Sequence, residues 1–386
     1  MDRTSGKRLR PQPRRSRAKA APRSRPSPRR ATTGLEQTNA GAAAAAAAAS
    51  RPALNLPQLQ RKLLAWYDVE QRPLPWRANR DPYRVWISEV MCQQTRAEVA
   101  APAFERFVAA FPDVTALAAA EEDAVLSLWS GLGYYSRARA LRRAAQQLRD
   151  AGYRTLPDDP SIVSALPGIG PYSLAAILSI AHGQALAAVD GNVVRVLSRL
   201  RRLGRPDARG RPHRELAMQL LDRDRPGDWN QALMELGARL CTPRAPRCVA
   251  CPIAPGCDAH AARDELSFPP PKPRRQKETL GVELEIVRDQ TGRILLERGG
   301  FALLSHLWLP PARLLDTPPE DFDLKHQILH RELRVVVKTR LLSERDLLRQ
   351  LESAAPYVER QIFKEEELAT IGRSSLLTKA LQQSRD

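Results

Sequence analysis

The stretch Ser161-Ile-Val-Ser-Ala-Leu-Pro-Gly-Ile-Gly-Pro-Tyr-Ser-Leu-Ala-Ala-Ile-Leu-Ser-Ile180 decides the fold class. Its first six residues predict a short helix, residues 166–170 a tight turn, and the residues from Pro171 onward a second helix. Gly168 and Gly170 let the backbone turn sharply, and Pro171 suits a first helical position. Free N–H groups at the start of the second helix form an anion site that suits a DNA phosphate. An ordinary helix–helix connection is the alternative, because two glycines in one turn are common.

The sequence on either side of this pair divides the chain into segments. Apolar residues recur at helical spacing from Leu54 to about His260, whereas residues 268–277 form a basic, proline-rich stretch. Residues 282–296 alternate around a Thr291-Gly292 turn and predict a β-hairpin, residues 334–342 predict another strand, and two short helices follow. We therefore predict a mainly α domain over residues 54–265, a linker over 266–279 and a small α+β domain over 280–386.

The first 53 residues have a different composition. Residues 1–30 hold twelve Lys or Arg residues and one Asp, and an alanine run spans residues 42–49. This composition predicts a disordered basic tail that adds nonspecific affinity for nucleic acid. A transit peptide is the alternative, although five prolines within thirty residues oppose an amphipathic helix. The chain as a whole carries a formal charge of +18, which suits a polyanionic partner without proving one.

Four of the five cysteines follow the spacing Cys241-x6-Cys248-x2-Cys251-x5-Cys257. Four thiolates within seventeen residues predict a metal centre. Zinc sites made of four cysteines usually contain two Cys-x2-Cys pairs and this chain has one, so the spacing favours iron–sulfur over zinc. The fifth cysteine, Cys92, lies in a helical run and is expected to be a small buried hydrophobe.

Two acidic residues are candidates for catalysis. In the helix predicted from Asp81-Pro82, Glu89 shares a face with apolar neighbours, which should raise its pKa toward that of a general acid working near neutral pH. A boundary glutamate that reaches solvent is the alternative. Asp190 precedes a helical run that includes Asn192, so the simplest interpretation is a helix N-cap, and such a carboxylate should stay ionised.

Taken together, these segments resemble the MutY family of adenine DNA glycosylases, within the endonuclease III superfamily. The resemblance covers residues from about 60 to 260 and includes LPWR (74–77), SEVMCQQT (88–95), GLGYYSRAR (131–139), LPGIG (166–170), VDGN (189–192) and the cysteine loop. It implies a helix–hairpin–helix glycosylase fold and a 4Fe–4S cluster bound by Cys241, Cys248, Cys251 and Cys257.

The resemblance also implies a role for each matching residue. Glu89 would protonate the adenine, Asp190 would stabilise or trap the positive sugar, and Tyr172 and Asn192 would support them. Residues expected to contact DNA or line the base pocket are Trp76, Arg77, Gln94, Thr95, Tyr134, Gly168, Gly170 and His330. Among these, Gln94 and Tyr134 would wedge into the base stack. Without the resemblance, Trp76 and Tyr134 would be interpreted as core aromatics.

One position separates classes within this superfamily. Bifunctional glycosylase–lyases carry a lysine nucleophile just after the hairpin, where this chain has Tyr172. No lysine occurs between Ser161 and Leu203, which excludes a Schiff base through this segment and predicts monofunctional hydrolysis. The alternatives are an endonuclease III-like glycosylase for oxidised pyrimidines and a noncatalytic DNA-binding protein whose four-cysteine loop holds a metal.

The C-terminal domain resembles, more weakly, the Nudix-related domain with which this family recognises 8-oxoguanine. Residues 303–310 are similar to one of its loops, but the chain has no Nudix box, so pyrophosphate hydrolysis is not expected. The family's Phe-Ser-His loop corresponds to Ile328-Leu329-His330, with His326 upstream. Because Leu329 replaces the serine hydroxyl, a preference for 8-oxoguanine over guanine is not predicted.

The sequence therefore predicts a monofunctional adenine DNA glycosylase of base excision repair. Its expected partner is double-stranded DNA in which adenine is mispaired with 8-oxoguanine or guanine, and the expected oligomeric state is a monomer. We see no secretory signal and no apolar run of about 18 residues outside the alanine tracts, so we expect no membrane association. The expected location is cytoplasmic, near the nucleoid of a bacterial-type cell.

Overall fold

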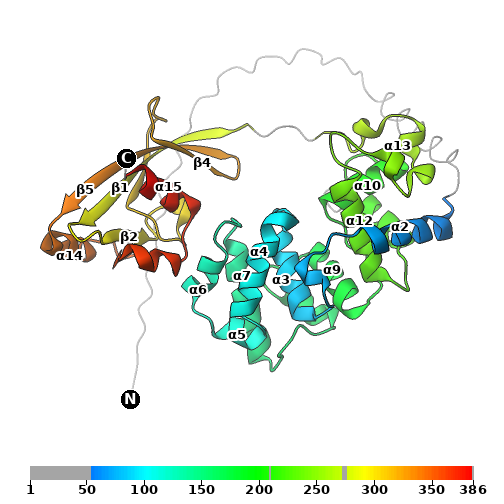
Figure 1. Cartoon of the computed structure of the whole chain (residues 1–386), viewed down its shortest axis with the longest axis horizontal. Coiled ribbons are helices and arrows are strands. Elements are labelled where there is room, and N and C mark those ends of the chain that lie inside the picture. Colours follow the sequence, from blue (N-terminus) through cyan, green and yellow to red (C-terminus); the bar gives the residue numbers. More distant parts are fainter. Residues whose placement is uncertain (1–53, 208–209, 272–275, 385–386) are drawn as a thin grey trace, which may run out of the picture. The chain divides into compact units, whose positions relative to one another are not determined.

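A computed structural model describes residues 54–207, 210–271 and 276–384. The predicted basic tail and part of the predicted linker lie outside these described residues. Within the described residues, helices fill the chain from Leu56 to Ala261, and strands appear from Glu278 onward (Figure 1). The predicted helical part and the predicted α+β part are both confirmed. In the described part of the chain, none of the helices combines the length and the apolar content that crossing a bilayer requires.

The helical part contains the predicted short helix, tight turn and second helix. Asp81 caps α3 by accepting a hydrogen bond from the Arg84 amide, and Pro171 occupies the first turn of α9, as the sequence indicated. The helices are α2 (Leu56–Glu70), α3 (Pro82–Cys92), α4 (Ala97–Ala110), α5 (Val114–Ala119), α6 (Glu122–Leu128), α7 (Ser136–Asp150), α8 (Pro160–Ala165), α9 (Pro171–His182), α10 (Gly191–Arg201), α11 (Arg211–Leu220), α12 (Pro226–Arg239) and α13 (Asp258–Ala261).

These helices pack into two separate apolar cores. Helices α3 to α9 form the first core, around buried side chains such as Trp86, Phe107 and Trp129. Helices α2, α10, α11 and α12 form the second core, around Leu63, Leu197 and Trp229, and three of the clustered cysteines pack against it. The chain passes from one core to the other just before α10, where Asp190 lies.

The C-terminal part is a mixed sheet with a helix on each face. Its strands are β1 (Glu278–Asp289), β2 (Ile294–Arg298), β3 (Ala312–Leu315), β4 (Leu324–Ile328), β5 (Arg331–Leu342) and β6 (Glu359–Phe363), in the order β4-β5-β1-β2-β6 with β3 paired to β1. Side chains from α15 (Ser375–Gln383) pack on one face with Leu284 and Ile286 of β1. On the other face, Val287 packs with Leu347 of α14 (Glu344–Glu352). Because successive side chains of β1 point to opposite faces, this strand contributes apolar residues to both faces of the sheet.

The predicted hairpin is confirmed, since β1 and β2 are antiparallel around Gly292, which has a left-handed φ of 82°. The sequence did not predict the principal pairing of the sheet. Strands β1 and β5 run parallel over twelve residue pairs, from Glu278 with Arg331 to Asp289 with Leu342.

Candidate active site

The largest cleft near the predicted catalytic residues lies where the two cores of the helical part meet. It has a volume of about 1,210 Å³ and includes Glu89 and Tyr172 from the first core and Asp190 and Asn192 from the start of α10. Small-molecule pockets have volumes of roughly 300–1,000 Å³, so this cleft has room for a larger ligand. All four predicted catalytic residues therefore share one open cleft.

Glu89 lies on α3 among buried neighbours, with its side chain at the cleft. Val85, Trp86 and Val90 on the same helix are buried. Burial raises the pKa of Glu89, a hydrogen bond from Tyr172 and the charge of Arg77 lower it, and the negative charge of Asp190 raises it; together these effects place the pKa at about 7. The predicted increase in its pKa is confirmed, and Glu89 holds a proton in a substantial fraction of molecules at neutral pH.

Tyr172 holds the Glu89 carboxyl in place. It lies in the first turn of α9, immediately after the hairpin, and its hydroxyl donates to Glu89 Oε2 at 2.7 Å. The same hydroxyl lies 3.6 Å from the Met234 sulfur on α12. Helices α3, α9 and α12 thus meet at this carboxyl.

Asp190 caps a helix and also lines the catalytic cleft. It caps α10, since its Oδ1 accepts from the Val193 amide at 2.7 Å, and its Oδ2 accepts from Asn192 Nδ2 at 3.0 Å. Burial nevertheless raises the pKa of Asp190 above its usual value, while these hydrogen bonds lower it. The expectation that this carboxylate stays ionised rested on the cap, and the structure adds a burial that opposes ionisation.

Asn192 is held in place by Arg195, which also contacts the start of the cysteine loop. Its Oδ1 accepts from Arg195 Nη2 at 2.9 Å, and Arg195 also donates to the carbonyls of Gly237 and Cys241 at 2.8 and 2.7 Å. Helix α12 can approach this closely because residue 237 is glycine. A Cβ there would lie 2.7 Å from the Asn192 Cβ, well inside van der Waals contact.

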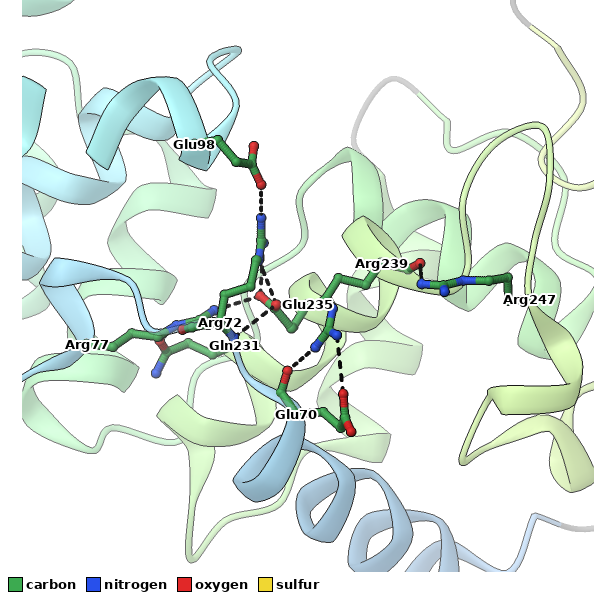
Figure 2. Close-up of polar contacts among 8 residues, drawn as sticks. All are labelled: Glu70, Arg72, Arg77, Glu98, Gln231, Glu235, Arg239 and Arg247. Atoms are coloured by element: carbon green, nitrogen blue, oxygen red, sulfur yellow. Dashed lines mark hydrogen bonds and ion pairs between the residues drawn. The ribbon is translucent and has the colours of Figure 1, made fainter. Parts of the chain in front are cut away.

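Sequence reasoning missed an ion-pair network around the buried Glu235 carboxylate, whose residues also line the cleft (Figure 2). Glu235 on α12 has a fully buried carboxylate that accepts from Arg72 Nε at 2.7 Å and Arg77 Nη2 at 3.0 Å. Arg72 also pairs with Glu98 on α4 at 2.5 Å, and Arg77 Nε donates to Gln231 at 3.2 Å. The sequence does contain a signal for this network, because a glutamate stands among the apolar residues of Leu233–Leu236. A carboxylate buried in such a helix face is normally paired with a cation, so a partner could have been sought.

The predicted DNA-contacting residues of the helical part lie in two loops, in a one-turn helix and in the hairpin turn. Gln94 and Tyr134 are exposed and have left-handed backbones, with φ values of 59° and 48°. Thr95 lies beside Gln94, while Trp76 and Arg77 lie on the one-turn helix η1 (Pro75–Arg77) in the cleft wall. Trp76 packs edge-on against Phe104, so it is also partly a core aromatic.

The two glycines of the hairpin turn differ. Gly168 has a φ of 85°, and a Cβ on it would lie 3.0 Å from the Ala140 Cβ, so this position requires glycine. Gly170 has an ordinary extended backbone and open space around it, and it serves as the N-cap of α9.

The four clustered cysteines line one small cavity against the second core, together with Val196, Leu236 and Ile253. None of them forms a disulfide. The Cys241 sulfur accepts from Arg199 Nη1 at 3.4 Å, and the Cys257 thiol lies 3.4 Å from the Arg199 carbonyl. Donor atoms of Cys248, His260 and Glu265 also lie within 4.8 Å of one another. Soft sulfur donors that line one cavity, beside a guanidinium that favours thiolates, suit an iron–sulfur centre.

Comparison with known proteins bears on the helical part. Residues 87–220 match the family model described as HhH-GPD superfamily base excision DNA repair protein. An adenine DNA glycosylase of Rattus norvegicus is 44% identical over 213 residues, which cover 52% of this chain and 41% of the relative. An adenine DNA glycosylase of Arabidopsis thaliana is 37% identical over 303 residues, which cover 67% of this chain and 48% of the relative. A thermostable thymine-DNA glycosylase of known structure is 27% identical in sequence, with a TM-score of 0.48. The match covers 52% of this chain and 94% of the chain of that glycosylase.

The chain resembles adenine DNA glycosylases. The resemblance predicted from the sequence motifs is thereby confirmed, and the HhH-GPD match includes Glu89, Tyr172 and Asp190. The chain spans about half the length of the curated relatives it matches.

The predicted C-terminal contact residue, His330, lies in the turn between β4 and β5. Its Nε2 is 3.8 Å from the Glu278 carboxylate. A second cleft, of about 580 Å³, is lined instead by its neighbour Leu329, by His326 and His306, and by Tyr134 of the helical part. Ser305, Ser374 and Ser375 also line this cleft, so it contains hydroxyl groups although Leu329 replaces the expected serine.

Proposed function

We propose that this chain is a monofunctional adenine DNA glycosylase of base excision repair, which hydrolyses the N-glycosidic bond of a mispaired adenine. The observation that carries the proposal is the pair of carboxyl groups at one cleft, Glu89 with a pKa of about 7 and Asp190 hydrogen-bonded at a helix start. Pairs of acids whose environments separate their protonation states are typical of glycoside hydrolysis. The similarity to curated adenine DNA glycosylases supports adenine as the base.

In the first step, protonated Glu89 donates its proton to a ring nitrogen of the extruded adenine. Protonation lets the base leave as a neutral molecule when the bond to the sugar carbon breaks and its electron pair stays on the base. Tyr172 orients the Glu89 carboxyl for this transfer through its 2.7 Å hydrogen bond.

Positive charge then develops on the sugar, and ionised Asp190 stabilises it. Because Asn192 and the Val193 amide hold both oxygens of Asp190, its position does not have to reorganise during the reaction. Water adds to the sugar carbon and gives its proton to the carboxylate of Glu89. The products are free adenine and an abasic site. The missing lysine between residues 161 and 203 supports hydrolysis rather than strand cleavage through a Schiff base.

DNA handling in this proposal depends on the loops around the cleft. Chemistry on a base requires its rotation out of the stack. We assign the insertion into the duplex to Gln94 and Tyr134, which are exposed on neighbouring loops. The turn at Gly168 and Gly170 brings the first amides of α9 toward a backbone phosphate.

We also propose that Cys241, Cys248, Cys251 and Cys257 hold a 4Fe–4S cluster. Their common cavity and the Arg199 donor support this assignment. Such a cluster supplies a structural cross-link and a redox-active group. The proposed bond cleavage uses the carboxyl groups of Glu89 and Asp190, which belong to the other cleft.

For the C-terminal part we propose a Nudix-like domain that reads the base opposite the adenine through the cleft of Leu329, His326 and Tyr134. The serine hydroxyls in that cleft are candidate partners for 8-oxoguanine, in place of the hydroxyl lost at position 329.

The test is single-turnover cleavage of duplexes that carry adenine opposite 8-oxoguanine, guanine or cytosine. We expect adenine release from the first two and little from the third. Glu89→Gln should lose at least about a thousandfold in rate while it still binds the mispair, and Glu105→Gln, an exposed glutamate on α4, is the matched control.

Equal loss of binding and catalysis in Glu89→Gln would remove this residue from the acid role. A colourless, zinc-containing protein that binds DNA without releasing any base would favour the noncatalytic alternative. Release of oxidised pyrimidines instead of adenine would favour an endonuclease III-like substrate.

A further inference from the structure

Two exposed loops have an unusual backbone: the loop of Gln94 lines the catalytic cleft, and the loop of Tyr134 lines the second cleft. Gln94 follows the end of α3 and Tyr134 precedes α7, and both adopt left-handed φ angles although neither is glycine. Such backbones are unfavourable for residues with a Cβ, so surrounding contacts must hold them in place.

One side chain contacts both loops. Arg137 lies in the first turn of α7, and its Nη1 donates to the carbonyls of Val90 at 2.8 Å and Met91 at 3.1 Å, and also to that of Gln93. Its Nη2 donates to Thr95 Oγ1 and the Leu132 carbonyl at 3.2 Å and to the Gly133 carbonyl at 3.3 Å. One nitrogen of the guanidinium therefore binds the end of α3, and the other binds both the loop before α7 and Thr95 beside Gln94.

The choice of carbonyls explains how this contact acts on the two strained residues. Gln93 and Gly133 directly precede Gln94 and Tyr134. The carbonyl of a preceding residue lies in the peptide plane whose rotation defines the φ angle of the next residue. A hydrogen bond to that carbonyl therefore restrains the left-handed conformation.

The guanidinium also packs against rings on this side of the molecule. Its carbon lies 5.2 Å from the centroid of the Tyr134 ring and 5.4 Å from that of Trp129. The Trp129 indole donates to the same Gly133 carbonyl at 3.1 Å. The Tyr134 ring is thus oriented by the group that also restrains its backbone.

We propose that Arg137 is a positioning residue that sets Gln94 and Tyr134 in one fixed relative geometry, so that the two side chains enter the duplex together when the adenine is extruded. This inference rests on the proposed function. It assigns Arg137 to the extrusion step and leaves the proton transfer to Glu89.

A lysine cannot replace this contact, because an ammonium group is a compact charge without the planar fork that reaches two loops at once. Burial lowers the pKa of Arg137 to about 10, so the guanidinium remains charged at neutral pH. Arg137→Lys therefore keeps the charge and removes the connection between the loops. Arg139→Lys on the same helix is the matched control, since Arg139 pairs with Glu122 at 2.9 Å and is not a partner of either loop carbonyl.

The experiment uses the full chain and follows two steps separately. Extrusion is followed by the fluorescence of 2-aminopurine placed opposite guanine, and chemistry by single-turnover release of adenine. Release is measured from a guanine mispair and from a duplex in which the adenine faces an abasic site and is easier to extrude. For Arg137→Lys we expect extrusion and mispair cleavage to slow by about tenfold or more, with a loss below about threefold on the unpaired adenine. The alkaline limit of the pH–rate profile should stay in place.

An equal loss on both substrates, or unchanged extrusion, would overturn the proposal. If Arg137→Lys is unfolded at the assay temperature, Thr95→Val carries the test, because it removes the hydroxyl that contacts both Arg137 and the Leu132 carbonyl. It should show the same selective loss at a smaller size, and equal rates on both substrates would count against the inference. If the unmodified chain releases no adenine at all, the proposed function fails, while the fluorescence still reports whether Arg137 controls extrusion.

Discussion

The protonation of Glu89 depends on two opposing effects. Burial raises its pKa and the hydroxyl of Tyr172 lowers it by donating to the carboxylate, and the resulting pKa is about 7. A general acid must hold its proton, so activity should be lost as the pH rises through this pKa. The environment of one side chain thereby sets the alkaline limit of the reaction.

Tyr172→Phe should move that alkaline limit to higher pH. The substitution removes the hydrogen bond that favours the charged form, so the pKa of Glu89 increases and the acid keeps its proton further into the alkaline range. Single-turnover rates measured across the neutral range would report the shift. An unchanged limit, or one displaced toward acid, would contradict the assignment of Glu89 as the acid.

Asp190→Asn should separate the capping role from the catalytic role. Asparagine caps helices about as well as aspartate, so the free energy of unfolding should change by less than about 0.5 kcal/mol. The neutral side chain cannot stabilise a positive sugar, and we expect the rate to fall by about a thousandfold or more. Urea unfolding and single-turnover cleavage on the same preparation would test both statements. A nearly normal rate would leave Asp190 with the helix cap alone.

Much of this site could be predicted from local sequence, because its main residues follow helix starts and a hairpin that short motifs encode. Glu89 was found from the apolar face around it, and Tyr172 from its place after the turn. Glu235 was not found, since its partners Arg72 and Arg77 lie 163 and 158 residues away. The increased pKa of Asp190 was missed for the same reason, because its burial comes from segments distant in sequence.

At the level of elements, the hairpin turn supports a direct comparison of two glycines. Gly168→Ala should lower the free energy of unfolding by about 1–2 kcal/mol, because alanine is strained at a φ of 85° and its methyl group meets Ala140. Gly170→Ala should be close to neutral for stability, since its backbone is extended and the space around it is open. Thermal unfolding of the two variants would test the difference. Similar losses in both would mean that the turn conformation is set elsewhere.

The elements of the C-terminal part were predicted less completely than those of the helical part. Alternation and a Thr291-Gly292 turn are enough to indicate the β1–β2 hairpin, whose strands are neighbours in sequence. The parallel pairing of β1 with β5 joins residues 53 positions apart, such as Glu278 and Arg331. Nothing in either strand specifies its partner, because both present similar alternating faces.

For the whole molecule, the separation into two cores predicts where loss of the cluster would act. Cys241, Cys251 and Cys257 pack against the core of α2, α10 and α12, whereas Glu89 belongs to the core of α3 to α9. Cys257→Ser should remove iron and increase amide hydrogen exchange in α10 and α12 more than in α3 and α9. Cys92→Ser is the control, because Cys92 packs on the other core and should leave the iron content unchanged. Uniform exchange changes across both cores would contradict this division.

The position of Asp190 between the two cores has a further consequence. Because Glu89 and Asp190 belong to different cores, the gap between the two acids is set by contacts between those cores, such as the buried hydrogen bond from Asn230 of α12 to Ser179 of α9. Low concentrations of urea should therefore inactivate the protein before circular dichroism records any loss of helix. A compound that binds at this junction and separates the two cores would inhibit base release without imitating a nucleotide.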